Sequence, residues 1–120
     1  KTAGMRFLFV IFHHPPYSSG NHGSNYEVRN VLCPLFVKNK VDIVFNGHDH
    51  AYERSMVDGV NYVITGGGGA PLYGKTKDNE FSIVFKKAHH FCLTTIAGNK
   101  LQFEAVGIDG AKLDSFEIIK

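Results

Sequence analysis

The sequence lacks the features of a membrane span or a secretory signal. Its longest apolar run, Phe7 to Phe12, is far too short to cross a bilayer. No charged segment followed by a longer apolar segment opens the chain, so no signal peptide is visible. No membrane partner is therefore indicated. The chain runs almost directly from Lys1 into a strand of the buried type, which is typical of a segment taken from a longer protein.

The sequence also lacks a large excess of positive or negative charge. Thirteen lysines and arginines against eleven aspartates and glutamates give a formal net charge of +2 at pH 7. No basic block with interleaved aromatic residues appears. Because nucleic-acid-binding surfaces need clustered positive charge, the composition gives no indication of a nucleic-acid partner.

Cysteine is limited to Cys33 and Cys92, and both lie among apolar residues. Such surroundings favour two buried thiols. A disulfide is the alternative, although the spacing of the two residues does not support one.

What the chain does contain is enough for one folded domain. Its 120 residues are 43% hydrophobic and 20% charged, which is typical of a globular protein. We therefore expect residues 1–120 to form a single domain, with little room for a second.

The first third of the chain predicts a strand, a helix and a second strand. Arg6 to Phe12 is apolar and too short for a helix, so it predicts a strand that ends at the prolines following it. Ser24 and Glu27 have the spacing of a capping box and predict the start of a helix. Pro34 predicts a kink or two short helices. Asp42 to Asn46 predicts a returning strand, parallel to the first.

The predicted helix has one apolar stripe at helical spacing. We expect its members to be buried together: Val28, Val31, Leu32, Leu35 and Phe36.

The rest of the chain has the pattern of a β-structure. Val60 to Thr65 predicts a strand, four glycines follow it, and Pro71 to Glu80 is rich in turn formers. Phe81 to Phe85 is either a strand or a turn. Three further strands, joined at Gly98-Asn99 and Asp109-Gly110, are predicted at Phe91–Ala97, Leu101–Gly107 and Ser115–Ile119. The fold class is therefore α/β, a strand-helix-strand crossover followed by an antiparallel meander.

Histidines gather where the first two strands end. His48 and His50 flank Asp49 directly after the second strand, and His13 ends the first. Parallel neighbours would bring these side chains to the crevice beyond the carboxyl edge of the sheet, where open α/β sheets place ligands. A single histidine is more often a core or surface residue. Three imidazoles at the ends of two strands instead favour a metal site.

Three runs of the sequence together resemble one family. They are His13-His14-Pro15-Pro16-Tyr17, the helix ending in Pro34-Leu35-Phe36, and Val41 to Arg54, which contains Gly47-His48-Asp49-His50-Ala51-Tyr52-Glu53-Arg54. They resemble the calcineurin-like metallophosphoesterases, most closely the purple acid phosphatase branch, where Gly-His-x-His-Ala-Tyr-Glu-Arg is highly specific. The likeness continues through Tyr62 to Tyr73 into the final hairpins. It implies the C-terminal half of the metallophosphoesterase β-sandwich.

The resemblance implies a dinuclear centre that hydrolyses phosphate esters by metal-activated water. His13 and His48 would hold one metal and His50 the other, the ions being two divalent or trivalent transition metals such as Fe, Zn or Mn. His22 lies near the place of a histidine that contacts the phosphate and protonates the leaving group, although a solvated loop residue is an equal interpretation. Two such ions clamp a phosphate and lower the pKa of a bound water.

The sequence also departs from the family. An early Asp, a Gly-Asp pair with a bridging carboxylate, and Gly-Asn-His are missing, and neither Asp42 nor Asp49 matches those motifs. We therefore expect the chain alone to be catalytically poor, its partners being a phosphate ester and the missing N-terminal half of the same domain. An exposed sheet edge is expected too. The alternative is a non-catalytic metal-binding or protein-interaction module with the same fold.

Residues 69–76 match the letters of a nucleotide-binding P-loop, Gly-x4-Gly-Lys-Thr. That motif needs a helix starting at its lysine, and the sequence after Lys75 has no helical period. Nucleotide binding is therefore a remote alternative. The glycines are better interpreted as a turn that allows close backbone approach, or as a flexible turn.

Other polar residues receive structural interpretations. His14 is expected to face outward or to support the ligands, because neighbours in a strand point to opposite faces. His89 and His90 are expected to begin the meander. Glu53 and Arg54 are expected to form a buried ion pair rather than to orient ligands.

Overall fold

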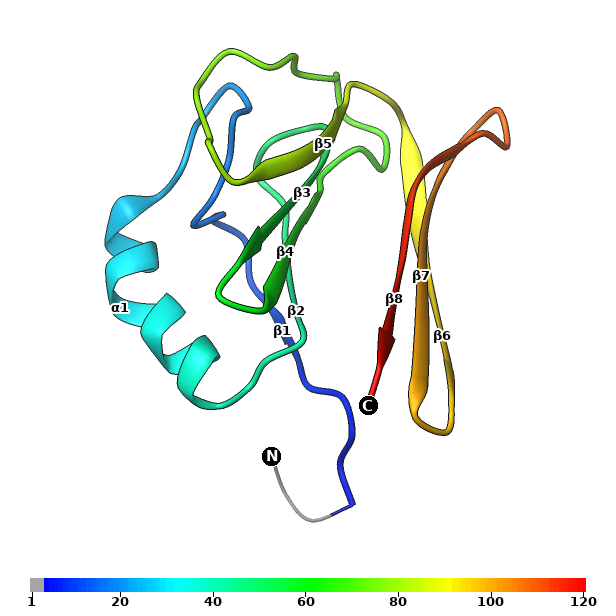
Figure 1. Ribbon diagram of the computed structural model, residues 1–120. Helices are drawn as coiled ribbons and strands as arrows, with labels where there is room; N and C mark the ends of the chain where they lie inside the picture. The colour runs from blue at the N-terminus through cyan, green and yellow to red at the C-terminus, as the bar shows by residue number, and fades with distance from the viewer. Residues whose placement is uncertain (1–3) are drawn as a thin grey trace.

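Two β-sheets and one helix form three layers in the computed structural model, which describes residues 4–120. The five-stranded sheet has the order β1-β2-β4-β3-β5, and the three-stranded sheet has the order β6-β7-β8. Helix α1 covers one face of the larger sheet and the smaller sheet covers the other (Figure 1). The predicted class, an α/β crossover followed by an antiparallel meander, is confirmed.

The elements follow the predicted pattern closely. In chain order they are β1 (Phe9–Ile11), α1 (Tyr26–Lys38), β2 (Ile43–Asn46), β3 (Tyr52–Val57), β4 (Val60–Thr65), β5 (Ser82–Lys86), β6 (His90–Ala97), β7 (Lys100–Gly107) and β8 (Lys112–Ile119). The sequence did not decide whether residues 81–85 form a strand or a turn. The structure shows that most of this segment belongs to strand β5. No helix within residues 4–120 has the length and apolarity that a membrane span requires.

The crossover sets the edge where a site can form. Strand β1 pairs in parallel with β2, Val10 opposite Val44, and β2 pairs in parallel with β4, Val44 opposite Tyr62. The carboxyl ends of all three strands therefore lie at the same edge of the sheet. Strand β1 is also one of the two edge strands of this sheet, and its Ile11 is largely exposed.

Helix α1 begins one residue later than predicted. Its N-cap is Asn25, whose side chain accepts a hydrogen bond from the Val28 N–H at 2.9 Å. The predicted capping box of Ser24 and Glu27 is wrong, because the Ser24 hydroxyl is used elsewhere. It accepts a hydrogen bond from the Ser18 N–H at 2.9 Å and so ties the preceding loop to the helix.

Pro34 does not divide the helix, so the predicted alternative of two short helices is wrong. Residues 26–38 form one helix with the proline inside it. A proline at this position leaves the carbonyl of Asn30 without its helical partner. Asn30 is exposed, so water can hydrate that carbonyl without any break in the helix.

The buried face of α1 is narrower than the predicted stripe. Cys33 and Phe36 are buried against the sheet, whereas Val31 and Leu35 are 63% and 50% exposed. The apolar residues of α1 spread around much of its circumference. The sheet covers only the side that carries Cys33 and Phe36.

Strand β3 is the element that the sequence prediction missed. It forms an antiparallel hairpin with β4, closed by Asp58 and Gly59 at φ values of 51° and 81°. An Asp-Gly pair with two positive φ angles is a strong hairpin signal. This signal was present in the sequence, directly after the Gly47 to Arg54 run.

Two hydrophobic cores hold the three layers together. Tyr62 and Val44 pack with the helix residues Cys33 and Phe36 on one face of the larger sheet. On the other face, the residues of the larger sheet pack against the meander. This second core comprises Ile43, Tyr52, Val63, Leu101, Phe103 and Ala105.

A buried ion pair ties the second core together. The Arg54 Nε on β3 donates to the Asp114 carboxylate on β8 at 2.7 Å, and the Tyr52 hydroxyl donates to the same carboxylate at 2.6 Å. The predicted partner of Arg54 was Glu53, which is wrong. Neighbours in a strand point to opposite faces, so Arg54 reaches the meander while Glu53 faces the other way.

The two cysteines are free thiols, as favoured from sequence. Cys33 is buried on the inner side of α1, as predicted, whereas Cys92 on β6 is only half-buried. The two residues belong to different cores, on opposite faces of the larger sheet.

Candidate metal centre

The loops at the carboxyl edge of the larger sheet carry most of the histidines. His13 and His14 follow β1, and His48 and His50 lie between β2 and β3. Backbone hydrogen bonds hold these loops together: the Gly47 N–H donates to the His13 carbonyl at 3.1 Å. The edge is therefore a fixed platform rather than a set of independent loops.

Three imidazoles meet at this edge. A ring nitrogen of His13, of His14 and of His48 all lie within 4.8 Å of one another. The His13 Nε2 and the His48 Nδ1 are in hydrogen-bond contact at 3.1 Å. We refer to His13, His14 and His48 as the histidine trio. His13 and His48 thus meet as the strand ends predicted, and their binding of a metal stays a prediction.

His14 was not expected in this group. Its ring centroid lies 4.7 Å from that of His48 and 5.0 Å from that of His13. Of the two predicted placements, the outward-facing one is wrong, because β1 ends at Ile11, and the supporting role beside the ligands stays a prediction. Beyond that residue the alternation of a strand no longer applies, and consecutive side chains can turn to the same side.

His50 lies outside the trio and is held separately. Its Nδ1 donates to the Pro71 carbonyl at 2.8 Å, and its ring stacks on Tyr73 at 4.2 Å between centroids. The Tyr73 N–H in turn donates to the His50 carbonyl at 2.8 Å. Among residues 4–120, the Nε2 of His50 has no hydrogen-bond partner. Histidines that bind metals commonly donate their other ring N–H to a carbonyl in this way.

His22 lies against the trio. Its ring centroid is 3.7 Å from that of His48, and its Nδ1 donates to the Asp49 carboxylate at 2.8 Å. The backbone N–H of His22 donates to the same oxygen at 2.8 Å. Because Asp49 holds Nδ1, the nitrogen of His22 that remains available is Nε2.

Two buried carboxylates position the loop that carries His22. Asp49 accepts hydrogen bonds from the Ser18 hydroxyl as well as from His22. Glu53 accepts from the N–H of Ser19 at 2.8 Å and from its hydroxyl. Both serines are fully buried. Sequence reasoning missed this network, since its partners lie 31 and 34 residues apart and share no local motif.

His48 has a conformation that few side chains adopt. Its φ is 68°, in the left-handed region that favours glycine. Burial lowers the pKa of its imidazole, and the neighbouring His22, His14 and His13 lower that pKa further. A lowered pKa keeps the ring neutral at pH 7, and the neutral ring is the form that binds metals.

The donor set fits a transition metal. Neutral imidazoles suit zinc, copper, iron and nickel. Tetrahedral zinc with Zn–N bonds of about 2.0–2.1 Å separates its ligand nitrogens by about 3.3 Å, close to the 3.1 Å between His13 and His48. No carboxylate belongs to the trio among the described residues. The nearest in sequence, Asp49, is already bound by Ser18 and His22.

The glycine run fits closely against the histidine loops. A Cβ at Gly66 would come within 2.1 Å of the Asp49 carbonyl oxygen, and one at Gly67 within 2.5 Å of the His90 ring. Gly68 and Gly69 meet nothing within 4 Å. The interpretation of close backbone approach is confirmed for the first two glycines. No helix starts at Lys75, so the P-loop alternative is contradicted.

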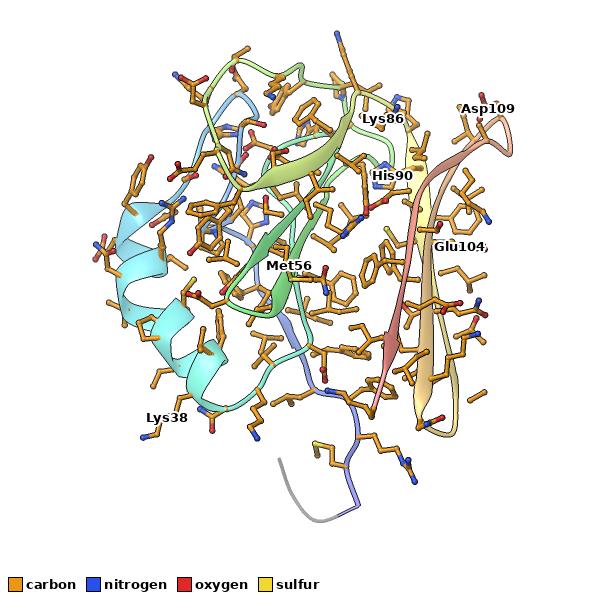
Figure 2. The ribbon with its side chains drawn as sticks, in the orientation of Figure 1. Lys38, Met56, Lys86, His90, Glu104 and Asp109 are labelled. Carbon is orange, nitrogen blue, oxygen red and sulfur yellow. The ribbon has the colours of Figure 1, made fainter. Side chains whose placement is uncertain are left out.

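His90 begins β6, as predicted, and lies between the two sheets (Figure 2). Its Nδ1 donates to the Ala88 carbonyl at 2.9 Å, which makes Nε2 the acceptor for the Thr65 hydroxyl at 2.9 Å. The Cys92 thiol donates to that hydroxyl at 3.3 Å. Both ring nitrogens of His90 are therefore paired within this hydrogen-bonded series, which gives His90 a structural role.

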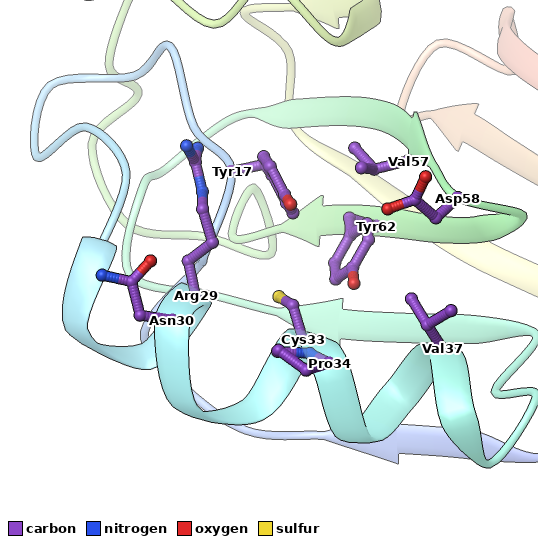
Figure 3. Close-up of a pocket in the computed structure, with 9 residues that line it drawn as sticks. All are labelled: Tyr17, Arg29, Asn30, Cys33, Pro34, Val37, Val57, Asp58 and Tyr62. Atoms are coloured by element: carbon purple, nitrogen blue, oxygen red, sulfur yellow. The ribbon is translucent and has the colours of Figure 1, made fainter.

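A separate cavity of about 490 Å³ lies between α1 and the β3–β4 turn (Figure 3). Tyr17, Cys33 and Tyr62 line it, with Arg29 at one side. Burial raises the pKa of the Cys33 thiol, which makes it a weak nucleophile. The guanidinium of Arg29 donates to the Pro16 carbonyl at 2.9 Å and stacks on Tyr17. These residues serve packing. The candidate metal ligands lie instead at the carboxyl edge of the larger sheet, which we call the histidine edge.

Comparison with known proteins points to one family. A family model for calcineurin-like phosphoesterases matches residues 2–52. Purple acid phosphatase 7 of Arabidopsis thaliana is 40% identical over 73 residues, covering 61% of this chain and 22% of that protein. A purple acid phosphatase of Glycine max is 47% identical over 73 residues, covering 58% of this chain and 16% of that protein. The chain spans about a fifth of the length of these curated relatives.

Solved structures agree with the relatives. Purple acid phosphatase PPD1 from yellow lupin (Lupinus luteus) seeds superposes with a TM-score of 0.79 at 27% identity, covering 94% of this chain and 25% of that one. The resemblance to purple acid phosphatases is confirmed. GAP50, described as the anchor in the inner membrane complex of Plasmodium, has the same fold, with a TM-score of 0.86 at 24% identity. The superposition covers 96% of this chain and 37% of the GAP50 chain.

The purple acid phosphatase likeness reaches both sheets. The family model ends at Tyr52, while the structural match to PPD1 covers 94% of the chain. The meander β6–β8 is therefore part of the same fold as the histidine edge.

Proposed function

We propose that this chain is the C-terminal part of a purple acid phosphatase-like domain, which hydrolyses phosphate esters at a dinuclear metal centre. The observation that carries the proposal is the convergence of His13 and His48, with His22 and His50 beside them, at the carboxyl edge of the sheet. This arrangement supplies imidazole ligands and a separate proton donor on one surface.

The ligands divide into two sets. His13 and His48 would hold one ion, and His50, whose Nδ1 is engaged by Pro71, would offer its Nε2 to the other. Iron, zinc or manganese would suit these donors. When bound, a pair of such ions polarises the phosphate and lowers the pKa of an attacking water.

His22 would serve as the general acid. Asp49 binds its Nδ1, so Nε2 is the atom that would carry the proton to the leaving oxygen. Ser18 and Ser19 anchor the loop to the buried carboxylates of Asp49 and Glu53, which limits the movement of His22. A fixed donor helps catalysis because its alignment does not have to be found at each turnover.

The rest of the centre would come from the N-terminal half of the same domain. A bridging carboxylate is absent from the trio, and Asp49 and Glu53 are committed to the serine loop. The curated relatives are several times longer than the matched region. We therefore expect residues 1–120 alone to show little or no hydrolysis of a phosphate ester.

A non-catalytic module is the alternative. It is favoured by the likeness of fold to GAP50, which is described as an anchor. Such a module would keep the layered fold and the histidines and would bind metal or protein without hydrolysis.

The test uses the protein in its longest natural form, loaded with iron, zinc or manganese. We expect hydrolysis of p-nitrophenyl phosphate, with kcat lowered about 100-fold or more in His22→Ala. His89→Ala is the matched control, since His89 lies outside the histidine edge, and it should leave kcat unchanged. Absence of hydrolysis with every metal would contradict the proposed phosphatase activity and favour the non-catalytic module.

A further inference from the structure

We propose that His13, His14 and His48 form a three-imidazole site that binds one zinc-like cation within this chain alone. The inference rests on the proposed function only for the pairing of His13 with His48. It adds His14 as the third ligand and requires no other part of the protein.

The distances are close to those of a bound metal. The His13 and His48 nitrogens already lie 3.1 Å apart, and all three candidate nitrogens fall within 4.8 Å. Tetrahedral zinc needs about 3.3 Å between ligand nitrogens. His13 and His14 are exposed, so rotation of their side chains can close the remaining gap without moving the backbone.

His14 is available for this role. Among the described residues its ring has contacts with the rings of His13 and His48, and it makes no side-chain hydrogen bond. His13 and His48 are in contact through their nitrogens at 3.1 Å and through their rings, with 5.0 Å between the centroids. In a neutral pair, one of these two nitrogens carries the proton and the other accepts it. Moving that proton to the other nitrogen of its ring would leave two lone pairs beside the His14 ring. A cation would satisfy all three.

The neighbouring histidines are committed elsewhere. His50 is fixed by Pro71 and Tyr73, outside the trio. His22 gives its Nδ1 to Asp49 and lies against the face of the His48 ring, with 31° between the ring planes. Among the described residues, no ring nitrogen of His22 belongs to the group of nitrogens that lie within 4.8 Å of one another. His14 is therefore the third ligand that the geometry favours.

The site is open on one side. A cavity of about 90 Å³ lies beside the trio and is lined in part by His14, His22 and His48. Three protein ligands with an open fourth position are the arrangement in which zinc keeps a bound water or an anion. His48 also holds its unusual φ of 68° at the point where its ring meets the other two.

The experiment is a Co²⁺ titration of this 120-residue chain, followed by Zn²⁺ displacement. Co²⁺ replaces zinc and reports its coordination number through visible absorption. We expect one ion per chain with the intense absorption of a four- or five-coordinate site. Affinity should fall about 100-fold or more in His48→Ala and in His14→Ala, because each loses a direct ligand. His89→Ala should change affinity less than about twofold.

Folding is controlled in the same samples. His14 is exposed, so circular dichroism of His14→Ala should match the parent chain. As a second variant, His14→Asp supplies an oxygen ligand, so it should keep binding with a shifted absorption spectrum. A role for His14 in packing alone would not produce that shift.

The outcomes separate the inference from the proposed function. Loss of binding in His48→Ala with full binding in His14→Ala would overturn the inference while leaving the pair of His13 and His48. Loss of Co²⁺ binding in His50→Ala but not in His14→Ala would overturn the inference in favour of a site that includes His50. No specific binding by the parent chain would overturn it too, and hydrolysis by the longest natural form would still test the proposed function independently.

Discussion

In the three-stranded sheet every strand pairs with its neighbour in sequence, whereas the five-stranded sheet runs in the order β1-β2-β4-β3-β5. The meander is closed by short turns and supplies one wall of a core. The larger sheet places the ends of β1 and β2 together from positions more than 30 residues apart. Only the second arrangement brings distant loops to one edge, and the histidine trio lies there.

The difference shows how this fold separates stability from chemistry. Among the described residues, the meander contributes Leu101, Phe103 and Asp114 to packing and none of its residues to the trio. The larger sheet shares that core on one face and carries the loops at its edge. The two sheets are therefore stabilised together, while metal binding is expected to involve only one of them.

The largest effect is expected where the sheets are tied together. Arg54→Met leaves the Asp114 carboxylate buried without its partner, which typically costs about 3–5 kcal/mol of unfolding free energy. Urea unfolding would measure the loss. The double variant Arg54→Met/Asp114→Asn should recover much of it, because no charge remains buried and the amide oxygen can still accept from the Tyr52 hydroxyl.

The matched control for this tie is Lys100→Met, which breaks an exposed pair with Glu117 within the meander. It should not change stability measurably. Two separate unfolding transitions in Arg54→Met would contradict the view that the sheets are stabilised as one unit.

The second largest effect is expected at the first glycine after β4. Gly66→Ala would place a Cβ within 2.1 Å of the Asp49 carbonyl oxygen and force the histidine loop to move, at a cost of about 3 kcal/mol. Gly68→Ala is the control, since it meets nothing within 4 Å. Thermal unfolding compares the two. Equal melting temperatures would show that the loops at this edge are loose.

Zinc should distinguish the two sheets. At a free concentration 100 times its dissociation constant, a ligand specific for the folded state adds about 2.7 kcal/mol to stability. Hydrogen exchange should show the local gain in protection at residues 13–14 and 47–49, and strand β7 should gain only what global stabilisation provides. EDTA should reverse the effect, and His48→Ala should lack it. A local gain in β7 would place the metal elsewhere.

The smallest effect concerns pH and the junction between the sheets. Burial lowers the pKa of His90 in the folded protein. Between its ordinary pKa of about 6.5 and that lower value, the unfolded chain binds more protons than the folded one. Stability is therefore full above about pH 6.5 and falls as the pH drops through this window. Melting temperatures of His90→Gln should fall less steeply with acid, and parallel profiles would contradict the assignment.

Much of the fold was predictable because its signals are local. Apolar runs bounded by turn residues gave β4 and the meander, and the crossover rule placed β1 parallel to β2. The strand β3 was missed although Asp58-Gly59 marked its end. The buried side of α1 was not predictable in detail, since the sheet, rather than the helix sequence, selects Cys33 and Phe36.

The site was predictable only in outline. The meeting of His13 and His48 follows from two parallel strands that end together. The position of His14 depends on β1 ending at Ile11, earlier than the apolar run indicates. The pairing of the serine loop with Asp49 and Glu53 depends on side chains that become neighbours only after folding.

The chain has no tryptophan, so its near-ultraviolet absorption comes mainly from five tyrosines. Three of them, Tyr17, Tyr52 and Tyr62, lie in the two cores, where burial is the main cause that raises the pKa of each hydroxyl. Their phenolate absorption is suppressed for as long as the layers stay packed. In an alkaline titration, the rise of tyrosinate absorption therefore also reports the pH at which the two cores unfold.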